Sequence, residues 1–352
     1  MLAHVGSCLD PAHNLALEEH LLATLPDGHP GWFLLWQNGP SVIVGRHQCT
    51  VDEVNLPYVT GHQIPVVRRM TGGGAVYHDT GNLNFSIITH ATATRLDFAR
   101  YLAPIVRALA SVGVTATISG RNDLEVGGRK ISGSGQRVTQ GRVLHHGTLL
   151  VQLDVDTMVA ALTPDATKIR AKGVASVRAR VTNIADHWRP GTTLSALQDA
   201  LVATCATGTA APTAADVAAA AALADSKYRQ WDWNFGASPP YSEERRERFP
   251  WGTVRLRLDV QRGHIRHCRI EGDFFAVRDI AELEARLVGC SSQPDALARA
   301  LADVPWQEHF GGCDARLMRD FFFSQAPNPA PNPAPNPDRR VQSAEQGRCA
   351  HR

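Results

Sequence analysis

Residues 68–86 bring together arginines and glycines in a pattern suited to binding an anion. Arg68 and Arg69 end an apolar run, Gly72–Gly74 follow, and a second apolar run begins at Ala75. Glycines allow the backbone to take positive φ angles and leave no Cβ between the main chain and a ligand. Their amide hydrogens can form an anion-binding concavity, and arginine adds positive charge. The pattern predicts a site for a phosphate or an acyl-phosphate.

The segments on either side of the glycines indicate what kind of loop this is. A P-loop or a dinucleotide-binding loop leads from a strand into a helix, whereas residues 75–78 and 84–88 both have the pattern of strands. No Gly-Lys-Ser/Thr follows the glycines. A Walker-type site is therefore not expected. The alternative that Gly72–Gly74 form only a wide hairpin or a bulge remains open.

A second pattern, over residues 120–136, predicts a β-hairpin that carries a lysine. Apolar and polar residues alternate on both sides of Gly127–Gly128, which is the signal of a two-residue hairpin turn. Since side chains alternate along a strand, Lys130 and Ser132 share one face and Ile131 lies on the other. A solvated edge-strand lysine is the alternative. The position between a Gly-Gly turn and a Ser-Gly-Ser-Gly run favours a functional lysine.

Two histidines lie within the same motifs and need separate interpretation. His78 and His146 could each face a binding site, or each could be packed in the core with a backbone carbonyl as partner. A metal site at His145 and His146 is not expected. Adjacent residues on a strand point to opposite faces, and no cysteine or carboxylate lies at ligand spacing.

The motifs, taken in order, resemble those of the lipoate–protein ligase family. The likeness covers nearly the whole chain up to about Phe323. Its main segments are Asn14-Leu-Ala-Leu-Glu-Glu, Arg69-x-x-Gly-Gly-Gly-Ala-Val-Tyr-His-Asp, Asn122-Asp-Leu, Gly128-Arg-Lys-Ile-Ser-Gly-Ser, His145-His-Gly-Thr-Leu-Leu and Trp231-Asp-Trp-Asn-Phe-Gly. Several independent motifs in the same order make chance similarity remote.

The resemblance implies a two-step reaction that depends on ATP. The carboxylate of lipoate attacks the α-phosphate of ATP, which releases pyrophosphate and leaves lipoyl-AMP. The ε-amine of a lysine on a carrier domain then displaces AMP. The expected co-substrates are ATP with Mg²⁺ and lipoate, with no tightly bound metal. The expected carriers are the lipoyl domains of 2-oxoacid dehydrogenase E2 subunits and the glycine cleavage H protein.

The resemblance also implies roles for individual residues. Lys130 matches the catalytic lysine of the family, which would contact both the acyl carbonyl and the α-phosphate. Asp123 would bind Mg²⁺ or pair with Lys130. The residues expected at ATP and the adenylate are Arg69, Gly74, Ala75, Val76, Tyr77, Asp123 and Lys130, and those expected at lipoate are Arg69, Gly74, Lys130 and His146. Lys172 and Arg180 resemble adenylate-loop residues, although an exposed basic loop would have the same composition.

Two other functions remain open beside the ligase. One is an octanoyl or lipoyl transferase between carriers, which would work without ATP, and the other is a non-catalytic binder of lipoyl domains. Cys49 stands where the family usually has Asn, so an acyl-thioester on its thiol is an alternative. A small buried apolar replacement is the simpler interpretation. The choice between lipoate and octanoate depends on pocket depth, which the sequence does not give.

Composition is typical of an intracellular enzyme. The chain has 352 residues, 43% of them apolar, which is enough for a substantial core and two domains. The net charge of +2 predicts neither a nucleic-acid nor a membrane partner. No export signal or membrane span is evident. The seven scattered cysteines are typical of reduced thiols. A cytoplasmic monomer is expected.

The expected fold is α+β. A catalytic domain of the biotin/lipoate-ligase type, built on mixed and antiparallel sheets with flanking helices, is expected over residues 1–242. A small α+β accessory domain is expected over 248–323, with a hairpin of strands over 251–271. The alanine-rich segment 194–223 is predicted to be helical. The Pro/Asn-rich tail 324–352 is predicted to be disordered. A mobile second domain would suit an enzyme that shields an acyl-adenylate from water.

Overall fold

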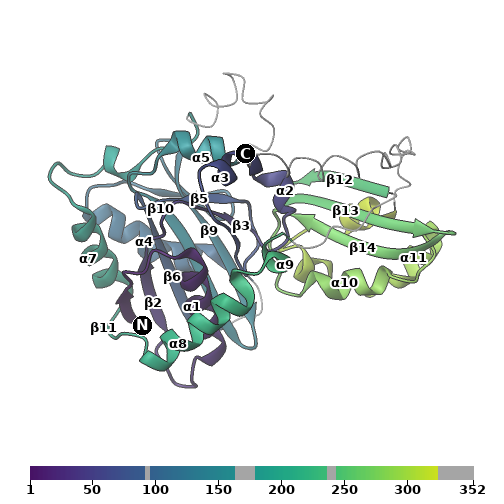
Figure 1. Cartoon of the computed structure of the whole chain (residues 1–352), viewed down its shortest axis with the longest axis horizontal. Helices are drawn as coiled ribbons and strands as arrows, with labels where there is room; N and C mark the ends of the chain where they lie inside the picture. Colours follow the sequence, from purple (N-terminus) through teal and green to yellow (C-terminus); the bar gives the residue numbers. More distant parts are fainter. Residues whose placement is uncertain (92–95, 163–178, 236–242, 324–352) are drawn as a thin grey trace, which may run out of the picture.

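The computed structural model describes residues 1–91, 96–162, 179–235 and 243–323. Lys172 and the Pro/Asn-rich tail therefore lie outside the described residues. Figure 1 shows a large body, built on a mixed sheet, beside a smaller body built on three strands. No helix in the described ranges is long and apolar enough to cross a membrane.

The large body is organised around an eight-stranded sheet in the order β11-β1-β2-β6-β10-β9-β8-β7. The strands from β2 to β7 along this order pair antiparallel, whereas β1 runs parallel to β2 and β11. The predicted hairpin is β8–β9, and Gly127 and Gly128 in its turn have φ angles of 56° and 74°. The strands span Leu2–Val5 (β1), Trp32–Trp36 (β2), Asn82–His90 (β6), Thr117–Ser119 (β7), Asp123–Val126 (β8), Arg129–Thr139 (β9), Arg142–Leu150 (β10) and Gly208–Thr209 (β11).

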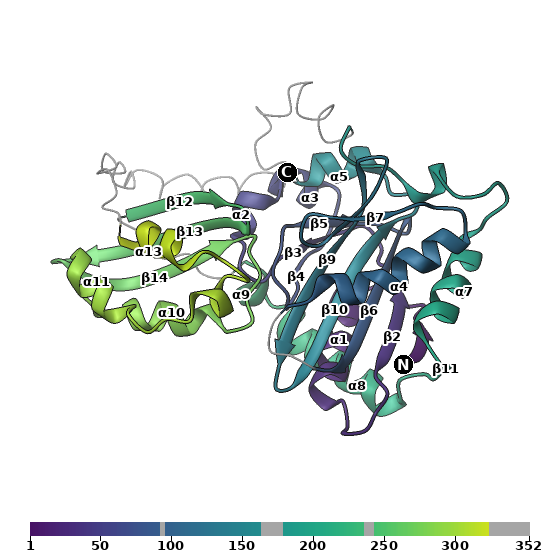
Figure 2. The same ribbon diagram turned by 180° about the vertical axis from the view of Figure 1, so that it is seen from behind.

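Helices cover both faces of this sheet (Figures 1 and 2). Phe33 and Leu35 of β2 share a core with α4 and α7, whereas Trp32 and Trp36 share another with α1 and α8. β2 is therefore apolar throughout, because both of its faces are buried. The helices span Pro11–Thr24 (α1), Phe98–Ser111 (α4), Leu194–Cys205 (α7) and Ala214–Leu223 (α8). The Asp10 side chain caps the start of α1 by accepting a hydrogen bond from the amide of Ala12.

The alanine-rich segment 194–223 is not one helix, contrary to the prediction. α7 ends at Cys205, and β11 then pairs with the edge strand β1 before Thr213 begins α8 with a capping box. Alanine favours a continuous helix, but the free edge of β1 offers hydrogen bonds that the isolated sequence does not reveal. A π-helical turn (η2, Ala224–Tyr228) and a short helix (α9, Trp231–Asn234) follow α8.

A second, three-stranded sheet holds the glycine-rich segment. Its order is β4-β3-β5, with β3 parallel to β4 and antiparallel to β5. The strands span Ser41–Val44 (β3), Val66–Arg68 (β4) and Val76–His78 (β5). Residues 69–75, the glycine loop, connect β4 to β5, so the predicted order of strand, loop and strand is confirmed. The short helices of this region span Thr50–Glu53 (α2), Leu56–Gly61 (α3), Val155–Leu162 (α5) and Ile184–Asp186 (η1).

The small body is an antiparallel sheet, β12-β13-β14, packed against helices. Its predicted hairpin turns at Arg262 and Gly263, with φ angles of 52° and 75°. β12 was not predicted from the sequence, because six of its seven residues are charged. The boundaries of the two predicted domains, at residues 242 and 248, stay a prediction. The elements span Glu243–Phe249 (β12), Gly252–Gln261 (β13), His264–Gly272 (β14), Ile280–Leu287 (α10), Pro294–Ala300 (α11), Trp306–His309 (α12) and Ala315–Phe323 (α13).

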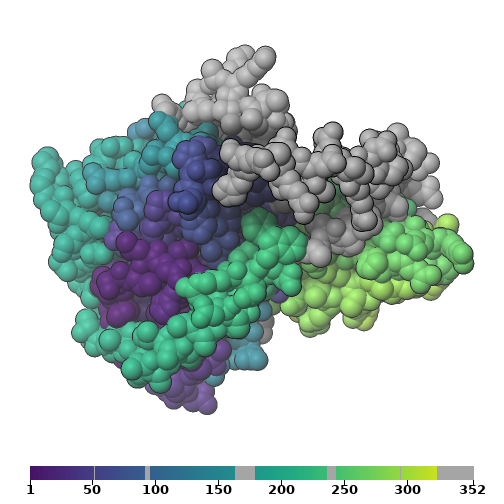
Figure 3. All heavy atoms as spheres, in the orientation of Figure 1, coloured from purple at the N-terminus to yellow at the C-terminus, as the bar shows by residue number. Residues whose placement is uncertain are grey.

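The two bodies touch at the glycine loop, and Figure 3 shows them packed side by side. Phe275, just beyond β14, is buried in the core of the large body, with its ring 5.0 Å from that of Phe98. The carbonyl of Phe274 accepts a hydrogen bond from the amide of Gly73 at 3.3 Å. A Cβ on Gly72 would lie 2.2 Å from the same carbonyl oxygen. The small body therefore supports the loop directly, and this contact leaves no room for a side chain at Gly72.

Candidate active site

The glycine loop is wrapped around the guanidinium group of Arg69. This side chain donates hydrogen bonds to the carbonyls of Gly72 (2.7 Å), Gly74 (2.8 Å) and Ile43 (3.1 Å). Because Arg69 engages the carbonyls of the loop, the polar groups left for a ligand are amides. Among the described residues, the amides of Gly74 and Ala75 have no acceptor.

Arg69 brings a buried positive charge to this loop. Its described hydrogen bonds go to carbonyl and hydroxyl oxygens rather than to a carboxylate. Burial, with a smaller contribution from the charge of Arg68, lowers the pKa of Arg69 to about 10. The guanidinium is therefore still protonated at neutral pH. A charge held without an ion-pair partner, beside free amides, is suited to an anionic ligand.

Arg68 does not join Arg69 at the loop, so the expectation that both arginines supply charge there is wrong for Arg68. Consecutive residues at a strand end point to opposite sides. The Arg68 guanidinium donates to the carbonyls of Gln48 (2.6 Å) and Gly45 (2.8 Å) and to the hydroxyl of Thr50 (2.7 Å). It also donates to the carbonyl of Asn234 at 3.0 Å. Arg68 thus ties segments of the large body together.

Lys130 lies on β9 beside the glycine loop and pairs with Asp123 on β8. The distance from Lys130 Nζ to Asp123 Oδ1 is 2.9 Å. A Cβ on Gly133 would lie 3.0 Å from Lys130 Nζ, so this strand glycine makes room for the lysine. The Lys130 amide donates to the carbonyl of Arg180 at 2.8 Å. The structure therefore brings Lys130, Asp123 and the backbone of Arg180 together.

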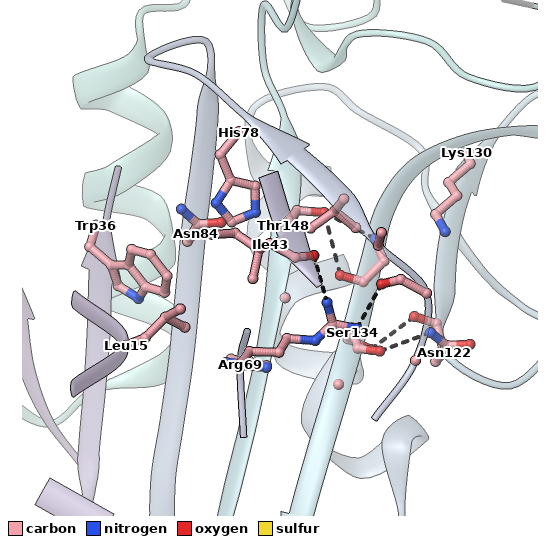
Figure 4. Close-up of a pocket in the computed structure, with 18 residues that line it drawn as sticks. Leu15, Trp36, Ile43, Arg69, His78, Asn84, Asn122, Lys130, Ser134 and Thr148 are labelled. Atoms are coloured by element: carbon pink, nitrogen blue, oxygen red, sulfur yellow. Dashed lines mark hydrogen bonds between the residues drawn. The ribbon is translucent and has the colours of Figure 1, made fainter. Parts of the chain in front are cut away.

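A cavity of about 110 Å³ lies between the glycine loop and the β9–β10 pair. One end is lined by Leu15 and Trp36, and the other end by Asn122 and Lys130. Figure 4 shows the two ends, with Arg69 and His78 between them. The cavity is thus apolar at one end and polar, with a cation, at the other. The predicted residues Gly74, Ala75, Val76 and His146 also line it.

Two of the residues predicted to contact ATP, Tyr77 and Asp123, do not line the cavity. Tyr77 is not among its lining residues, because the Tyr77 side chain packs in a separate core under β3. Asp123 reaches the cavity only through its ion pair with Lys130. No cluster of three or more potential metal ligands occurs in the ranges that the structure describes.

The three histidines near the cavity are all buried, in different settings. His145 points away from the cavity into a cluster of aromatic rings, so the prediction that His145 and His146 face opposite sides is confirmed. His78 lines the cavity, and its Nδ1 lies 3.0 Å from the Asn38 amide. Burial lowers the pKa of His78 to about 3, so its ring is neutral at neutral pH. His146 contacts Glu18 at 3.0 Å and Thr71 at 2.7 Å.

Glu18 was not predicted as a site residue, although it lies in the motif Asn14-Leu-Ala-Leu-Glu-Glu that supports the family resemblance. It lies on α1, and only 1% of its side-chain surface is exposed. The sequence did contain a signal. Glu18 falls at helical spacing from Leu15 and Leu22, both buried, and so stands on the apolar face of the helix. A carboxylate on such a face must find polar partners inside the protein.

Comparisons with known proteins identify the family to which the chain belongs. A family model described as the lipoyl protein ligase A/B catalytic domain matches residues 10–206, and one described as the bacterial lipoate protein ligase C-terminus matches residues 238–322. Lipoate–protein ligase 1 of Staphylococcus aureus is 42% identical over 310 residues, which cover 87% of this chain and 94% of that protein. The chain belongs to the lipoate–protein ligase family. The family recognised from the motifs is therefore confirmed.

Solved structures of the family share the fold of this ligase. Plasmodium falciparum LipL1 in complex with lipoate has a TM-score of 0.73 and 25% identity, covering 86% of this chain and 94% of that one. The bipartite lipoate protein ligase of Thermoplasma acidophilum, described alongside its E2 lipoyl domain, has a TM-score of 0.60 and 29% identity, covering 68% of this chain and 98% of that one. A lipoate-protein ligase A bound with ATP has a TM-score of 0.57 and 26% identity, covering 67% and 97%. The predicted α+β fold is confirmed.

Cys49 of this ligase lies outside the cavity that contains Lys130. It precedes α2 in the cleft between the two bodies, and its Sγ lies 3.6 Å from Nη1 of Arg257 on β13. Burial first, then the negative charge of Glu271, raises the pKa of the thiol to about 11. Cys49 lines an adjoining cleft with Gly74 and Ala75 but does not line the cavity itself. A protonated thiol in that position is poorly placed to form an acyl-thioester. The geometry favours the interpretation of Cys49 as a small buried residue.

We expect Cys49→Ala to keep the ligase activity within about threefold of the wild type, because the substitution removes only a small buried group away from the cavity. Steady-state lipoylation of a carrier domain would measure this. An acyl-thioester trapped on the wild-type protein, together with loss of activity in Cys49→Ala, would contradict the assignment.

Proposed function

We propose that the cavity beside the glycine loop is where this ATP-dependent lipoate–protein ligase forms lipoyl-AMP and passes the lipoyl group to a carrier. The observation that carries the proposal is the polarity of the cavity. Its apolar end, at Leu15 and Trp36, suits a hydrocarbon chain. Its opposite end combines Lys130 with Arg69 and free loop amides, which suits a carboxylate next to a phosphate.

In the first step, a carboxylate oxygen of lipoate attacks the α-phosphorus of ATP, and the bond to the β-phosphate breaks. Both reactants are anions, so fixed positive charge and fixed donors lower the barrier. Lys130 would contact the carboxylate and the α-phosphate together. Arg69 and the amides of Gly74 and Ala75 would hold the phosphate. Val76 and the backbone of Tyr77 would extend the surface that contacts the adenylate.

In the second step, the amine of a carrier lysine attacks the acyl carbon, and the bond to AMP breaks. Negative charge then develops on the acyl oxygen, and Lys130 is the group placed to stabilise it. His146 would contact the lipoyl chain through its ring, because both of its nitrogens already have partners. Arg180, joined to Lys130 through the backbone, and Lys172 would help to cover the adenylate.

We further propose that Mg²⁺ arrives with ATP and supplies charge neutralisation at the phosphates. Asp123 is suited to a supporting role, since carboxylate oxygens are ligands that Mg²⁺ prefers and this carboxylate is partly exposed beside Lys130.

We expect Asp123→Asn to lower the rate of adenylation about tenfold and to raise the Mg²⁺ concentration needed for half-maximal rate. The amide keeps the hydrogen-bonding shape but loses the charge. A Mg²⁺ titration of adenylation would test this, and an unchanged titration curve would limit Asp123 to pairing with Lys130.

The proposed partners are carrier proteins with a lipoyl domain, namely E2 subunits of 2-oxoacid dehydrogenases and the glycine cleavage H protein. The related Thermoplasma ligase, described alongside its own E2 lipoyl domain, supports this class of partner. The near-balanced net charge of +2 gives no reason to expect nucleic acid or an anionic membrane. The scattered cysteines favour a reducing compartment, so we place the enzyme in the cytoplasm as a monomer.

The test of the proposed function is lipoate-dependent ATP–pyrophosphate exchange with Mg²⁺ and without any carrier. Exchange requires reversible formation of lipoyl-AMP, so the ligase is expected to catalyse it. Transfer from a loaded carrier without ATP, with no exchange, would instead support the octanoyl or lipoyl transferase. The family relationship favours the ligase.

A further inference from the structure

A series of buried hydrogen bonds runs from β2 through α1 to β10, close to the cavity. Trp36 Nε1 donates to Ser86 Oγ at 2.7 Å, and Ser86 Oγ donates to Glu18 Oε1 at 2.5 Å. His146 Nδ1 lies 3.0 Å from both carboxylate oxygens of Glu18. All four side chains are less than 10% exposed. Buried polar groups of this kind specify one arrangement when every member has a partner.

The series continues from His146 into the glycine loop. Thr71 Oγ1 lies 2.7 Å from His146 Nε2, and Arg69 Nε donates to the same hydroxyl at 3.1 Å. Arg69 in turn holds the carbonyls of Gly72 and Gly74. The carboxylate of Glu18 is therefore connected to the carbonyls of the glycine loop through three side chains, those of His146, Thr71 and Arg69.

The partners assign the direction of most hydrogen bonds in this series. Tryptophan and the Nε of arginine can only donate, and a carboxylate can only accept. Ser86 and Nδ1 of His146 therefore donate to Glu18, and Thr71 accepts from Arg69. The hydroxyl of Thr71 has one hydrogen and two lone pairs, so it is a partner for Nε2 of His146 in either protonation state of the ring.

We propose that Thr71, His146 and Glu18 are positioning residues that fix the guanidinium of Arg69, and through it the amides of the glycine loop, for adenylation. The proposal rests on the proposed function of the cavity. Four of the five N–H groups of Arg69 are used: three hold the carbonyls and the Thr71 hydroxyl of the loop, and one donates to the carbonyl of Ile43 on β3. A rotation of Arg69 would release the carbonyls of the loop and misdirect its amides. Donors fixed before the reaction stabilise a transition state without reorganising.

A glycine on β9 provides an independent reason to assign this role. A Cβ on Gly135 would lie 2.6 Å from Thr71 Oγ1 and 3.1 Å from His146 Nε2. Gly135 is not among the residues with positive φ, so its backbone does not require glycine. Glycine in a strand weakens the strand. The space for the hydrogen bond between Thr71 and His146 accounts for its presence.

Thr71→Val removes the shared hydroxyl and nearly keeps the shape of the side chain, so it tests the connection directly. We expect it to lower kcat for carrier-free exchange about 30-fold, somewhat less than the loss of a direct donor to the reacting atoms. The KM for lipoate should change less than about threefold, because the apolar end of the cavity is untouched. Thr71→Ser keeps the hydroxyl and should restore most of kcat. A wild-type kcat in Thr71→Val, or a kcat in Thr71→Ser no better than in Thr71→Val, would overturn the proposal.

A second pair of variants tests the same connection from the side of β9. Gly135→Ala would force Thr71 and His146 apart and should lower kcat about tenfold. Gly61→Ala is the matched control, since a Cβ there meets nothing within 4 Å, and it should behave as the wild type. Equal activity of Gly135→Ala and Gly61→Ala would overturn the proposal.

The NMR signal of the Arg69 Nε–H group separates this inference from the proposed function. In Thr71→Val the signal should shift and exchange faster with water, because its acceptor is lost, whereas in Thr71→Ser it should stay close to the wild-type position. An unchanged signal in Thr71→Val would overturn the inference even if exchange fell. A wild-type protein without any exchange would overturn the proposed function, while the signal would still decide whether Thr71 fixes Arg69.

Discussion

Lys130→Ala is expected to lower lipoate-dependent ATP–pyrophosphate exchange about 1,000-fold. Removing one donor from a charged transition state commonly costs 10² to 10³ in rate, and Lys130 is proposed to contact both reacting anions, so the upper part of that range applies. The side chain is partly exposed, and its one ion pair among the described residues is to Asp123. We therefore expect the melting temperature to stay close to that of the wild type. The measurement is exchange at saturating ATP together with a thermal melt.

Arg129→Ala is the matched control for Lys130→Ala. Arg129 is the neighbouring residue on β9, and it is exposed. Adjacent strand residues point to opposite faces, so removal of this positive charge should leave exchange unchanged. A similar loss in both variants would mean that general charge, rather than the position of Lys130 in the cavity, supports the reaction. Full exchange in Lys130→Ala would contradict the catalytic assignment.

Arg69→Lys is expected to lower kcat for exchange about 100-fold and to destabilise the protein. Lysine keeps the charge but lacks the planar fork that holds the carbonyls of Gly72 and Gly74 and the hydroxyl of Thr71. Buried acceptors left without a donor cost about 1–3 kcal/mol each, so the thermal midpoint should fall by several degrees. The kcat should be expressed per folded molecule, from active-site titration with lipoate and ATP.

Arg68→Lys provides the comparison that separates stability from catalysis. Arg68 is as buried as Arg69 and also bonds mainly to carbonyls, but on the other side of the strand. Its substitution should lower the thermal midpoint similarly while kcat per folded molecule stays within about threefold of the wild type. If both variants kept the same kcat per folded molecule, Arg69 would be a structural arginine only.

The local patterns near the cavity were predictable because they depend on short segments. The Gly127–Gly128 turn and the strands on either side of the glycine loop follow from turn chemistry and alternation. The predicted shared face of Lys130 and Ser132 does not, because an irregularity in the β8–β9 register interrupts the alternation between them. Most of the residues predicted to contact ATP or lipoate line one cavity, whereas Tyr77 and Asp123 do not. The activity, in contrast, depended on resemblance to a family, since spacing alone indicated only an anion site.

The features that could not be predicted from the sequence depend on contacts between segments that lie far apart in the chain. The two adjacent arginines have the same local pattern, and only the partners of Arg68 at Thr50 and Asn234 show that it is structural. Glu18 becomes part of the site through His146, which lies more than 120 residues away. β12 could not be recognised as a strand because most of its residues are charged. Cys49 lies near the motifs in sequence, yet its contact is with the small body.

The most direct test of the account is a crystal structure of the ligase with a non-hydrolysable analogue of lipoyl-AMP. The account predicts the dithiolane end of the analogue at Trp36 and the acyl oxygen within hydrogen-bonding distance of Lys130 Nζ. It also predicts the phosphate mimic on the amides of Gly74 and Ala75. An adenylate without contact to Lys130, or one whose phosphate mimic does not reach the amides of Gly74 and Ala75, would contradict it.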